Sequence, residues 1–257
     1  MKVVILCGGK GSRLASPKDN TPKPLVIING KPMIWHIMKI YMHYGYNEFI
    51  LPLGFGGDKI KEYFWNYEWK NRDFIKDTSK STIKYLSTTD NWKITFVDTG
   101  IETMTGGRIM KIKKYIDEDI FMLTYGDGLS DVNIEKLLKF HNKMGKIATV
   151  TGIERKSQFG VLNLKDNLAI SFDEKSKLEG VINGGYFVLN KEVFNYLKDD
   201  KECIFEQEPL KNIASDGELA VFMHKGYWQS VDTYKDLVSV NNSWKGVDDA
   251  KADGGVI

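Results

Sequence analysis

Residues 3–13 read Val3-Val4-Ile5-Leu6-Cys7-Gly8-Gly9-Lys10-Gly11-Ser12-Arg13, an unbroken apolar run followed at once by a glycine-rich segment. A short, β-branched run without polar alternation is typical of a parallel strand that is buried on both faces. The glycines after it predict a loop whose backbone can come close to a ligand. The chain therefore begins like an open α/β sheet, in which ligands gather at the carboxyl ends of the strands.

The alternation of strands and helices continues through the first 150 residues, which form an α/β unit. Apolar residues at helical spacing predict helices at about 34–44, 58–65, 107–115 and 134–144. Short apolar runs predict strands at 48–53, 93–97, 120–125 and 147–153. Residues 66–92 are polar and aromatic without a clear period, and we interpret them as an insertion or excursion.

The second half of the chain contains more strands. Residues 159–164 and 168–172 flank Asp166-Asn167 and predict a β-hairpin. Further strands are expected at 181–189, 219–223 and 227–231, and short helices near 192–197, 208–214 and 233–240. The prediction is an α/β fold with a mixed central sheet, helices on both faces and a small β-rich appendage. We expect one domain over 1–244, with halves of about 1–150 and 151–244, and a loose tail over 245–257.

The composition is typical of a globular intracellular protein. The 257 residues include 36 Lys+Arg and 34 Asp+Glu, a formal net charge of +2, which is too balanced for a nucleic-acid or anionic-membrane binder. No apolar run approaches the roughly 20 residues that span a bilayer. The two cysteines, Cys7 and Cys203, cannot form a disulfide framework, and no Cys/His cluster has zinc spacing. We expect a cytoplasmic protein with small anionic ligands, no nucleic acid and no membrane partner.

The segment Gly8-Gly9-Lys10-Gly11-Ser12-Arg13 is the first candidate site. Its backbone N–H groups can approach a phosphate closely, and its polar side chains add donors and positive charge. It is neither a Walker A sequence nor a dinucleotide fingerprint, and a plain turn is the alternative interpretation. The following Thr21-Pro22-Lys23-Pro24 favours function, because prolines fix the backbone that carries Lys23, whose ammonium can meet a polyphosphate.

Two aspartates follow predicted strands. Asp127 stands between two glycines after the strand at 120–125, and Asp232 follows the strand at 227–231. Magnesium is commonly held by one or two carboxylates together with substrate phosphates, so this pair is the candidate Mg²⁺ site. The alternatives are a turn residue for Asp127 and a helix N-cap for Asp232.

Four further segments could contact a ligand. Met104-Thr105-Gly106-Gly107-Arg108 could cradle a nucleotide or simply start a helix, and the paired glycines of Asn183-Gly184-Gly185 imply a close approach within a strand. Glu174-Lys175 could be a solvated charge pair. Glu206-Gln207-Glu208-Pro209 could accept a hydrogen bond from a hydroxyl or place acids at a helix start. A phosphate loop with lysines and strand-end acids suits phosphoryl or nucleotidyl transfer.

These residues resemble a known family. Leu6-Cys7-Gly8-Gly9-Lys10-Gly11-Ser12-Arg13-Leu14, with Lys23-Pro24 and Gly30-Lys31-Pro32-Met33, is similar to the signature of sugar-1-phosphate nucleotidyltransferases. Further blocks look most like the glucose-1-phosphate cytidylyltransferases of that family, and they include Met104-Thr105-Gly106-Gly107-Arg108, Thr124-Tyr125-Gly126-Asp127-Gly128, Ile182-Asn183-Gly184-Gly185 and Glu206-Gln207-Glu208-Pro209-Leu210. The resemblance implies a Rossmann-like nucleotidyltransferase fold, a homo-oligomer, and a reaction of CTP with α-D-glucose 1-phosphate that gives CDP-glucose and pyrophosphate.

The resemblance also implies roles for individual residues, with the β-rich appendage on the sugar-binding side. The implied catalytic residues are Arg13, Lys23, Asp127 and Lys175, and the implied magnesium ligands are Asp127 and Asp232. The implied nucleotide-binding residues are Leu6, Gly8, Gly9, Gly11, Ser12, Arg13, Lys23, Thr105, Arg108 and Asp127. The implied residues for the sugar phosphate are Tyr125, Gly126, Glu174, Lys175, Asn183 and Gly184.

The chain departs from the family pattern at three places. Glu174-Lys175-Ser176 stands where Glu-Lys-Pro is usual, residues 154–157 differ, and the tail after Trp244 does not follow the family. The two internal differences lie in the half expected to hold the sugar, so another nucleoside triphosphate or another phosphorylated acceptor is an alternative. A catalytically silent subunit that binds a nucleotide sugar is a further alternative, which the presence of both metal acids disfavours.

Overall fold

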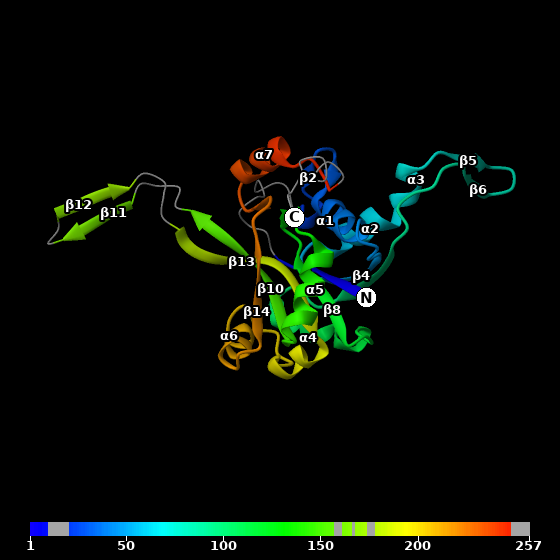
Figure 1. The fold of residues 1–257 in the computed structure, drawn as a ribbon. Helices are drawn as coiled ribbons and strands as arrows, with labels where there is room; N and C mark the ends of the chain where they lie inside the picture. The colour runs from blue at the N-terminus through cyan, green and yellow to red at the C-terminus, as the bar shows by residue number, and fades with distance from the viewer. Residues whose placement is uncertain (10–20, 157–160, 166–167, 174–177, 248–257) are drawn as a thin grey trace.

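A seven-stranded mixed sheet forms the centre of the molecule (Figure 1). The computed structural model describes residues 1–9, 21–156, 161–165, 168–173 and 178–247. In order across the sheet, the strands are β14 (Leu219–His224), β10 (Ala148–Lys156), β13 (Leu178–Asn190), β8 (Ile120–Tyr125), β1 (Lys2–Leu6), β4 (Glu48–Leu53) and β7 (Lys93–Asp98). β1 pairs in parallel with β4 and β8, whereas β13 is antiparallel to both β8 and β10. The predicted mixed sheet is confirmed.

Helices cover both faces of the sheet, as predicted. Val3 and Ile5 pack into one buried cluster with α1 (Met33–Met42), whereas Val4 and Leu6 pack into a second cluster with α4 (Thr105–Lys111). Successive residues of a strand point to opposite faces, so the unbroken apolar run fills both cores. Other elements are η1 (Lys23–Leu25), β2 (Ile27–Ile28), β3 (Lys31–Pro32), α2 (Gly57–Trp65), α5 (Ile134–Met144) and α6 (Glu208–Ser215).

Some element bounds differ from the predictions. The helix expected at 107–115 begins at Thr105 and ends at Lys111, followed by the 3-10 turn η2 (Lys113–Tyr115). The element near 192–197 is a 3-10 helix, η3 (Lys191–Tyr196). The last helix is α7 (Tyr234–Ser243), and Thr233 is its N-cap, in a capping box with Asp236. The N-cap interpretation of Asp232 is therefore wrong. In the tail expected to be loose, Val247 packs against the core.

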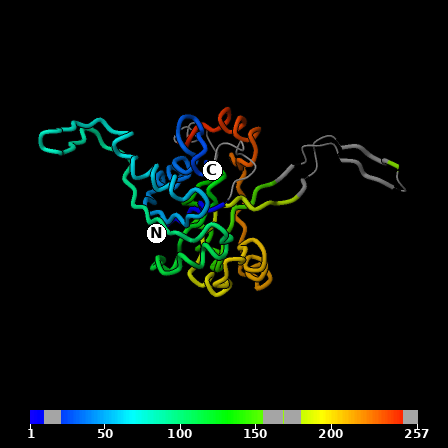
Figure 2. Tube along the Cα trace, turned by 180° about the vertical axis from the view of Figure 1, so that it is seen from behind, coloured from blue at the N-terminus to red at the C-terminus, as the bar shows by residue number. Residues whose placement is uncertain are grey.

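Two hairpins extend from the body in opposite directions (Figure 1), and the one at residues 74–85 is also seen in cyan in Figure 2. β11 (Val161–Lys165) and β12 (Leu168–Asp173) form the hairpin predicted after residue 153. Residues 66–92 contain α3 (Tyr67–Asn71) and a second hairpin, β5 (Phe74–Asp77) with β6 (Thr82–Tyr85). We call residues 73–86 the arm. Its strands showed no period in the sequence because neither face packs on the core, and the first three residues of β5 are exposed.

Candidate active site

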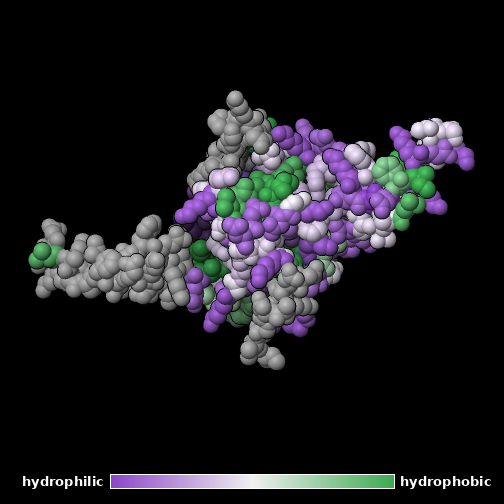
Figure 3. Space-filling model, turned by 90° about the horizontal axis from the view of Figure 1, so that it is seen from above, coloured by the Kyte–Doolittle hydropathy of each residue, from purple (hydrophilic) through white to green (hydrophobic). Residues whose placement is uncertain are grey.

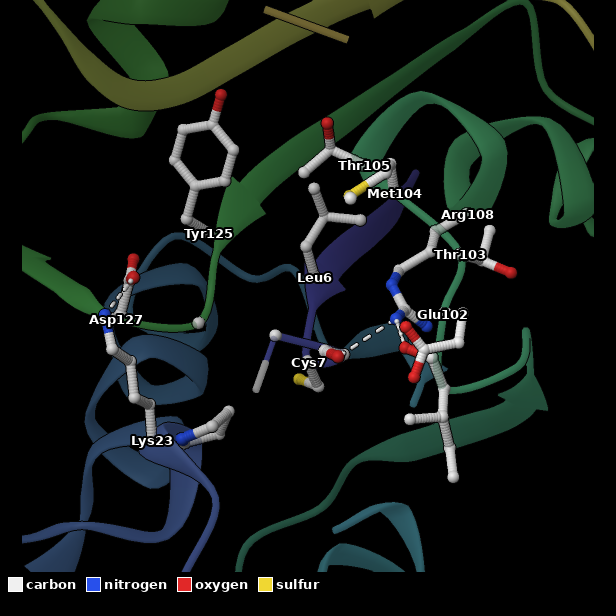
Figure 4. A pocket seen from close by; sticks show the side chains of 15 residues that line it. Leu6, Cys7, Lys23, Glu102, Thr103, Met104, Thr105, Arg108, Tyr125 and Asp127 are labelled. Atoms are coloured by element: carbon white, nitrogen blue, oxygen red, sulfur yellow. Dashed lines mark hydrogen bonds and ion pairs between the residues drawn. The ribbon is translucent and has the colours of Figure 1, made fainter. Parts of the chain in front are cut away.

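A cavity of about 570 Å³ lies at the carboxyl ends of β1 and β8 (Figure 4). Its walls come from the end of β1, the turn η1, the segment before α4, and the end of β8. The lining residues are Leu6, Cys7, Gly8, Gly9, Lys23, Pro24, Ile101, Glu102, Thr103, Met104, Thr105, Arg108, Tyr125, Gly126 and Asp127. This is the place where ligands bind in open α/β sheets. The fold thus brings together candidate residues that lie up to 121 positions apart, from Leu6 to Asp127.

Lys23 contacts both predicted metal acids. Its Nζ lies 3.1 Å from Asp127 Oδ2 and 2.6 Å from Asp232 Oδ1. Pro22 is extended before the 3-10 turn that carries Lys23, and Leu25 N donates to Pro22 O at 2.8 Å, so the lysine is held by a short, fixed turn. Burial lowers the pKa of Lys23, but the two carboxylates outweigh this effect and the net pKa is raised. Lys23 is therefore a charged ammonium at neutral pH.

The two aspartates are neighbours because two short strands pair. β15 (Trp228–Ser230) is antiparallel to β9 (Gly128–Ser130), with Ser230 opposite Gly128. Just beyond this ladder, Val231 N donates to Asp127 O at 2.8 Å. The next residue, Asp232, consequently stands beside Asp127, more than 100 positions away in the chain. β9 was not predicted from the sequence.

The two carboxylates fit a magnesium ion. Their oxygens already converge on one cationic atom, Lys23 Nζ, so positive charge is favoured at this point. Magnesium takes oxygen ligands, commonly one or two carboxylates with phosphates and water. Among the residues that the structure describes, no group of three or more His, Cys, Asp or Glu side chains could hold a metal. A magnesium ion here would thus need further oxygen ligands from an anionic substrate and water.

Arg108 lies at the base of the cavity with 4% of its surface exposed. Its guanidinium donates to Leu53 O at 2.9 Å, Thr99 Oγ1 at 2.6 Å, Gly100 O at 2.9 Å, Gly8 O at 2.9 Å and Ile101 O at 3.1 Å. Burial lowers its pKa. A Cβ on Gly8 would overlap the guanidinium, so glycine is needed there. The nucleotide contact of Arg108 stays a prediction, and the structure adds that Arg108 ties the end of β1 to the turn at 99–101.

Tyr125 and Thr105 are joined by Glu206, a residue that was not among the predicted site residues. Tyr125 OH donates to Glu206 Oε1 at 2.5 Å, and Thr105 Oγ1 donates to Glu206 Oε2 at 2.6 Å. Burial raises the pKa of Tyr125, and the charge of Glu206 raises it further. The sequence offered Glu206 only as a hydroxyl acceptor or a helix start, because its partners lie 81 and 101 positions away.

Asn183 and Gly184 lie beside this group on β13. Asn183 Nδ2 donates to Tyr125 OH at 3.3 Å, and Asn183 Oδ1 accepts from Gly185 N at 2.7 Å. Trp228 Nε1 donates to Gly184 O at 2.7 Å, and a Cβ on Gly184 would lie 2.6 Å from Thr151 Oγ1. The paired glycines therefore allow close approach of other protein groups. Gly11, Ser12, Arg13, Glu174 and Lys175 lie outside the described residues.

A family model described as nucleotidyl transferase matches residues 2–245, almost the whole chain. The chain belongs to the nucleotidyl transferase family. This confirms the resemblance seen in the sequence, and the protein is a nucleotidyltransferase. The cavity at the ends of β1 and β8 is its candidate active site.

Two relatives of this nucleotidyltransferase cover nearly all of it. It is 53% identical over 244 residues to the probable glucose-1-phosphate cytidylyltransferase of Bacillus subtilis (strain 168), covering 95% of this chain and 96% of the relative. It is 42% identical over 248 residues to the glucose-1-phosphate cytidylyltransferase of Salmonella typhimurium, with coverage of 95% and 96%.

Solved structures share the fold. The crystal structure of HddC from Yersinia pseudotuberculosis is 25% identical, with a TM-score of 0.70 and coverage of 95% of this chain and 99% of that one. HddC complexed with GMP-PN matches with a TM-score of 0.68, 25% identity and the same coverage. Within the described part of this nucleotidyltransferase, no helix has the length and apolar character to cross a membrane.

Proposed function

We propose that this nucleotidyltransferase joins CTP and α-D-glucose 1-phosphate to give CDP-glucose and pyrophosphate. The observation that carries the proposal is the contact of Lys23 with both Asp127 and Asp232 beside the cavity, because a triphosphate with its metal needs one cation and such acids. The names of the Bacillus subtilis and Salmonella typhimurium relatives support this substrate pair.

The reaction needs no covalent bond to the protein. A phosphate oxygen of the sugar phosphate attacks the α-phosphorus of CTP in line, the bond to the bridging oxygen breaks, and pyrophosphate leaves with the electron pair. Cys7 lines the cavity, but burial raises the pKa of its thiol and keeps it protonated, so it is a poor nucleophile. Catalysis then consists of positioning and charge neutralisation.

Each charged residue has a proposed part in that neutralisation. Asp127 and Asp232 would hold Mg²⁺, which supplies positive charge against the triphosphate when bound. The charged ammonium of Lys23 is proposed to contact the phosphates of the nucleotide. Arg13 is proposed for the nucleotide and Lys175 for the sugar phosphate, both by their match to the family pattern. The proposed sugar contacts are Tyr125, Gly126, Glu174, Asn183 and Gly184.

Pyrophosphate release tests the proposal, with magnesium, glucose 1-phosphate and each of CTP, UTP, dTTP, ATP and GTP in turn, and with products identified by mass spectrometry. We expect CDP-glucose from CTP alone, loss of turnover with a chelator, and recovery on adding magnesium. Turnover with a different triphosphate would contradict the proposed nucleotide, CTP. Turnover only with another sugar 1-phosphate would contradict the proposed acceptor, glucose 1-phosphate. Binding of CDP-glucose without turnover of any pair would favour the silent subunit.

A second copy of the chain is the proposed protein partner. The arm extends from the body with exposed apolar side chains, which gather along it in Figure 3. They include Ile75 at 53% exposure and Ile83 at 51%. At the base of the arm, an apolar groove of about 530 Å³ is lined by Lys61, Glu62, Phe64, Trp65, Trp92, Ile94 and Phe96. Because a lone two-stranded hairpin is marginally stable in water, an arm held against the groove of another copy explains both features.

Analytical ultracentrifugation tests this partner. We expect the wild type to sediment as an oligomer, and Ile75→Asp/Ile83→Asp to shift it to the monomer, because two buried charges would cost more than the apolar contact contributes. Leu168→Asp is the control, since Leu168 is 72% exposed on the other hairpin. A monomeric wild type, or an arm variant that keeps the oligomer, would contradict the assignment.

A further inference from the structure

One carboxylate connects two walls of the cavity. Glu206 precedes α6, Thr105 begins α4, and Tyr125 ends β8. Both oxygens of Glu206 are used, with Oε1 accepting from Tyr125 OH at 2.5 Å and Oε2 accepting from Thr105 Oγ1 at 2.6 Å. Figure 4 shows the two hydroxyl groups on the same side of the cavity, away from Lys23.

The neighbouring amides set the direction of both hydrogen bonds. Phe205 N donates to Thr105 Oγ1 at 2.9 Å, so the threonine hydroxyl is left to donate its proton to Glu206. Asn183 Oδ1 accepts from Gly185 N, which turns Asn183 Nδ2 towards Tyr125 OH at 3.3 Å. Tyr125 therefore also donates to Glu206. Both hydroxyl groups thus donate to Glu206. An ionised carboxylate only accepts hydrogen bonds, so it suits two donors.

Glu206 acts from behind the wall. Thr105 and Tyr125 line the cavity, whereas Glu206 is not a lining residue. The Tyr125 ring also packs edge-on against Phe187, with centroids 5.9 Å apart. Gly185 makes room for it, since a Cβ there would lie 2.6 Å from Tyr125 Cδ2. Tyr125 is two residues before Asp127, so its position bears directly on the predicted metal acid.

We propose that Glu206 is a positioning residue for nucleotidyl transfer, which locks the start of α4 and the end of β8 at a fixed separation on one side of the cavity. This proposal rests on the proposed function, because it assumes that the cavity holds the reacting phosphates. A reaction that depends on in-line alignment is sensitive to such a separation, and a misplacement of about 1 Å can cost about a hundredfold in rate.

Glu206→Gln is the central variant, with Glu208→Gln as the matched control. The amide keeps one acceptor oxygen but presents N–H groups to the other hydroxyl, whereas Glu208 is an exposed carboxylate that pairs with Lys198 at 2.7 Å. We expect kcat of Glu206→Gln to fall about tenfold to a hundredfold, with smaller changes in KM for both substrates. The Glu208→Gln enzyme should stay within about twofold of wild type. Each rate is divided by the concentration of nucleotide-binding sites. A loss of folded protein therefore does not lower the measured kcat.

A double-variant cycle separates positioning from a merely structural role. If Glu206 acts through Tyr125, the Tyr125→Phe/Glu206→Gln enzyme should be no slower than the slower single variant, within about twofold. A wild-type kcat for Glu206→Gln, or effects that multiply in the double variant, would overturn the proposal. If Glu206→Gln does not fold, Thr105→Val and Tyr125→Phe with their double variant decide in the same way.

The substrate pair is established on the wild type first, so the two proposals fail separately. If CTP and glucose 1-phosphate do not react but another pair does, the proposed substrates are wrong and the cycle is measured with the active pair. If no pair reacts, the cycle is measured on the nucleotide dissociation constant by calorimetry. Non-additive losses would then still support the role of Glu206 in aligning the walls, and unchanged binding in every variant would overturn it.

Discussion

Asp127→Asn is expected to lower turnover by about a thousandfold while the protein stays folded. The amide has the same shape but no charge, so it cannot offset a metal ion, and Lys23 loses one of its two carboxylate partners. Asp127 is 37% exposed, and its backbone bond from Val231 does not involve the side chain, so the fold should tolerate the change. Pyrophosphate release and thermal unfolding of the same sample measure both parts of the prediction.

Asp216→Asn is the control for this change. Asp216 is exposed at the end of α6 and accepts a hydrogen bond from Tyr196 OH at 2.8 Å, which an amide oxygen can also accept. Its rate should match that of the wild type. Asp232→Asn should resemble Asp127→Asn, and the double variant should be little worse than either, because the two acids act as a unit. A rate within about tenfold of wild type for Asp127→Asn would show that the metal assignment is wrong.

Arg108→Ala is expected to cost about 3 kcal/mol of stability and to abolish nucleotide binding. The change removes the donor of five hydrogen bonds in a place where water is largely excluded, and among the acceptors Leu53 O and Gly8 O keep a second donor, Thr99 N and Phe55 N. It also releases Gly8 from the turn at 99–101. Arg108→Lys should recover only part of the loss, because one ammonium cannot reach acceptors on both sides of the planar guanidinium. Urea unfolding and calorimetric titration with CTP measure the two effects.

Two adjacent glycines provide a matched control for Arg108. A Cβ on Gly8 would overlap the Arg108 guanidinium, whereas a Cβ on Gly9 would meet nothing within 4 Å. Gly8→Ala should therefore lower the unfolding free energy by an amount comparable to Arg108→Ala, and Gly9→Ala should leave it within about 0.5 kcal/mol of wild type. Equal stability of Gly8→Ala and Gly9→Ala would show that Arg108 does not need the space, and the tie between β1 and the turn would be refuted.

Much of the fold could be predicted because its signals are local. The apolar run at the start of the chain predicts a strand that is buried on both faces, and this strand is β1. The predicted helix near 34–44 is α1, because its apolar side is one continuous face. The arm could not be predicted in the same way. Its strands bury neither face in this chain, so no period marks them.

In the candidate site too, the residues with local signals could be predicted, and their long-range partners could not. From residue types and spacing alone, Lys23 between prolines and Asp127 between glycines were chosen, and the structure places both at one cavity. The partners of these residues are different. Asp232 was a helix N-cap or a metal acid on sequence grounds. The structure gives the N-cap to Thr233, and the pairing of β15 with β9 places Asp232 beside Asp127, whereas its metal role stays a prediction.

The sequence by itself determined the order of the long buried strands and the main helices, the glycines after β1 and the acid after β8, because each depends on neighbouring residues and on which face is buried. Only the tertiary structure decided that Lys23 bridges two acids, that Arg108 fills the space above Gly8, and that Glu206 joins Thr105 to Tyr125. These contacts join residues 81 to 209 positions apart. No local sequence pattern predicts such contacts, because they form only when the packed sheet brings separate strand ends to one edge.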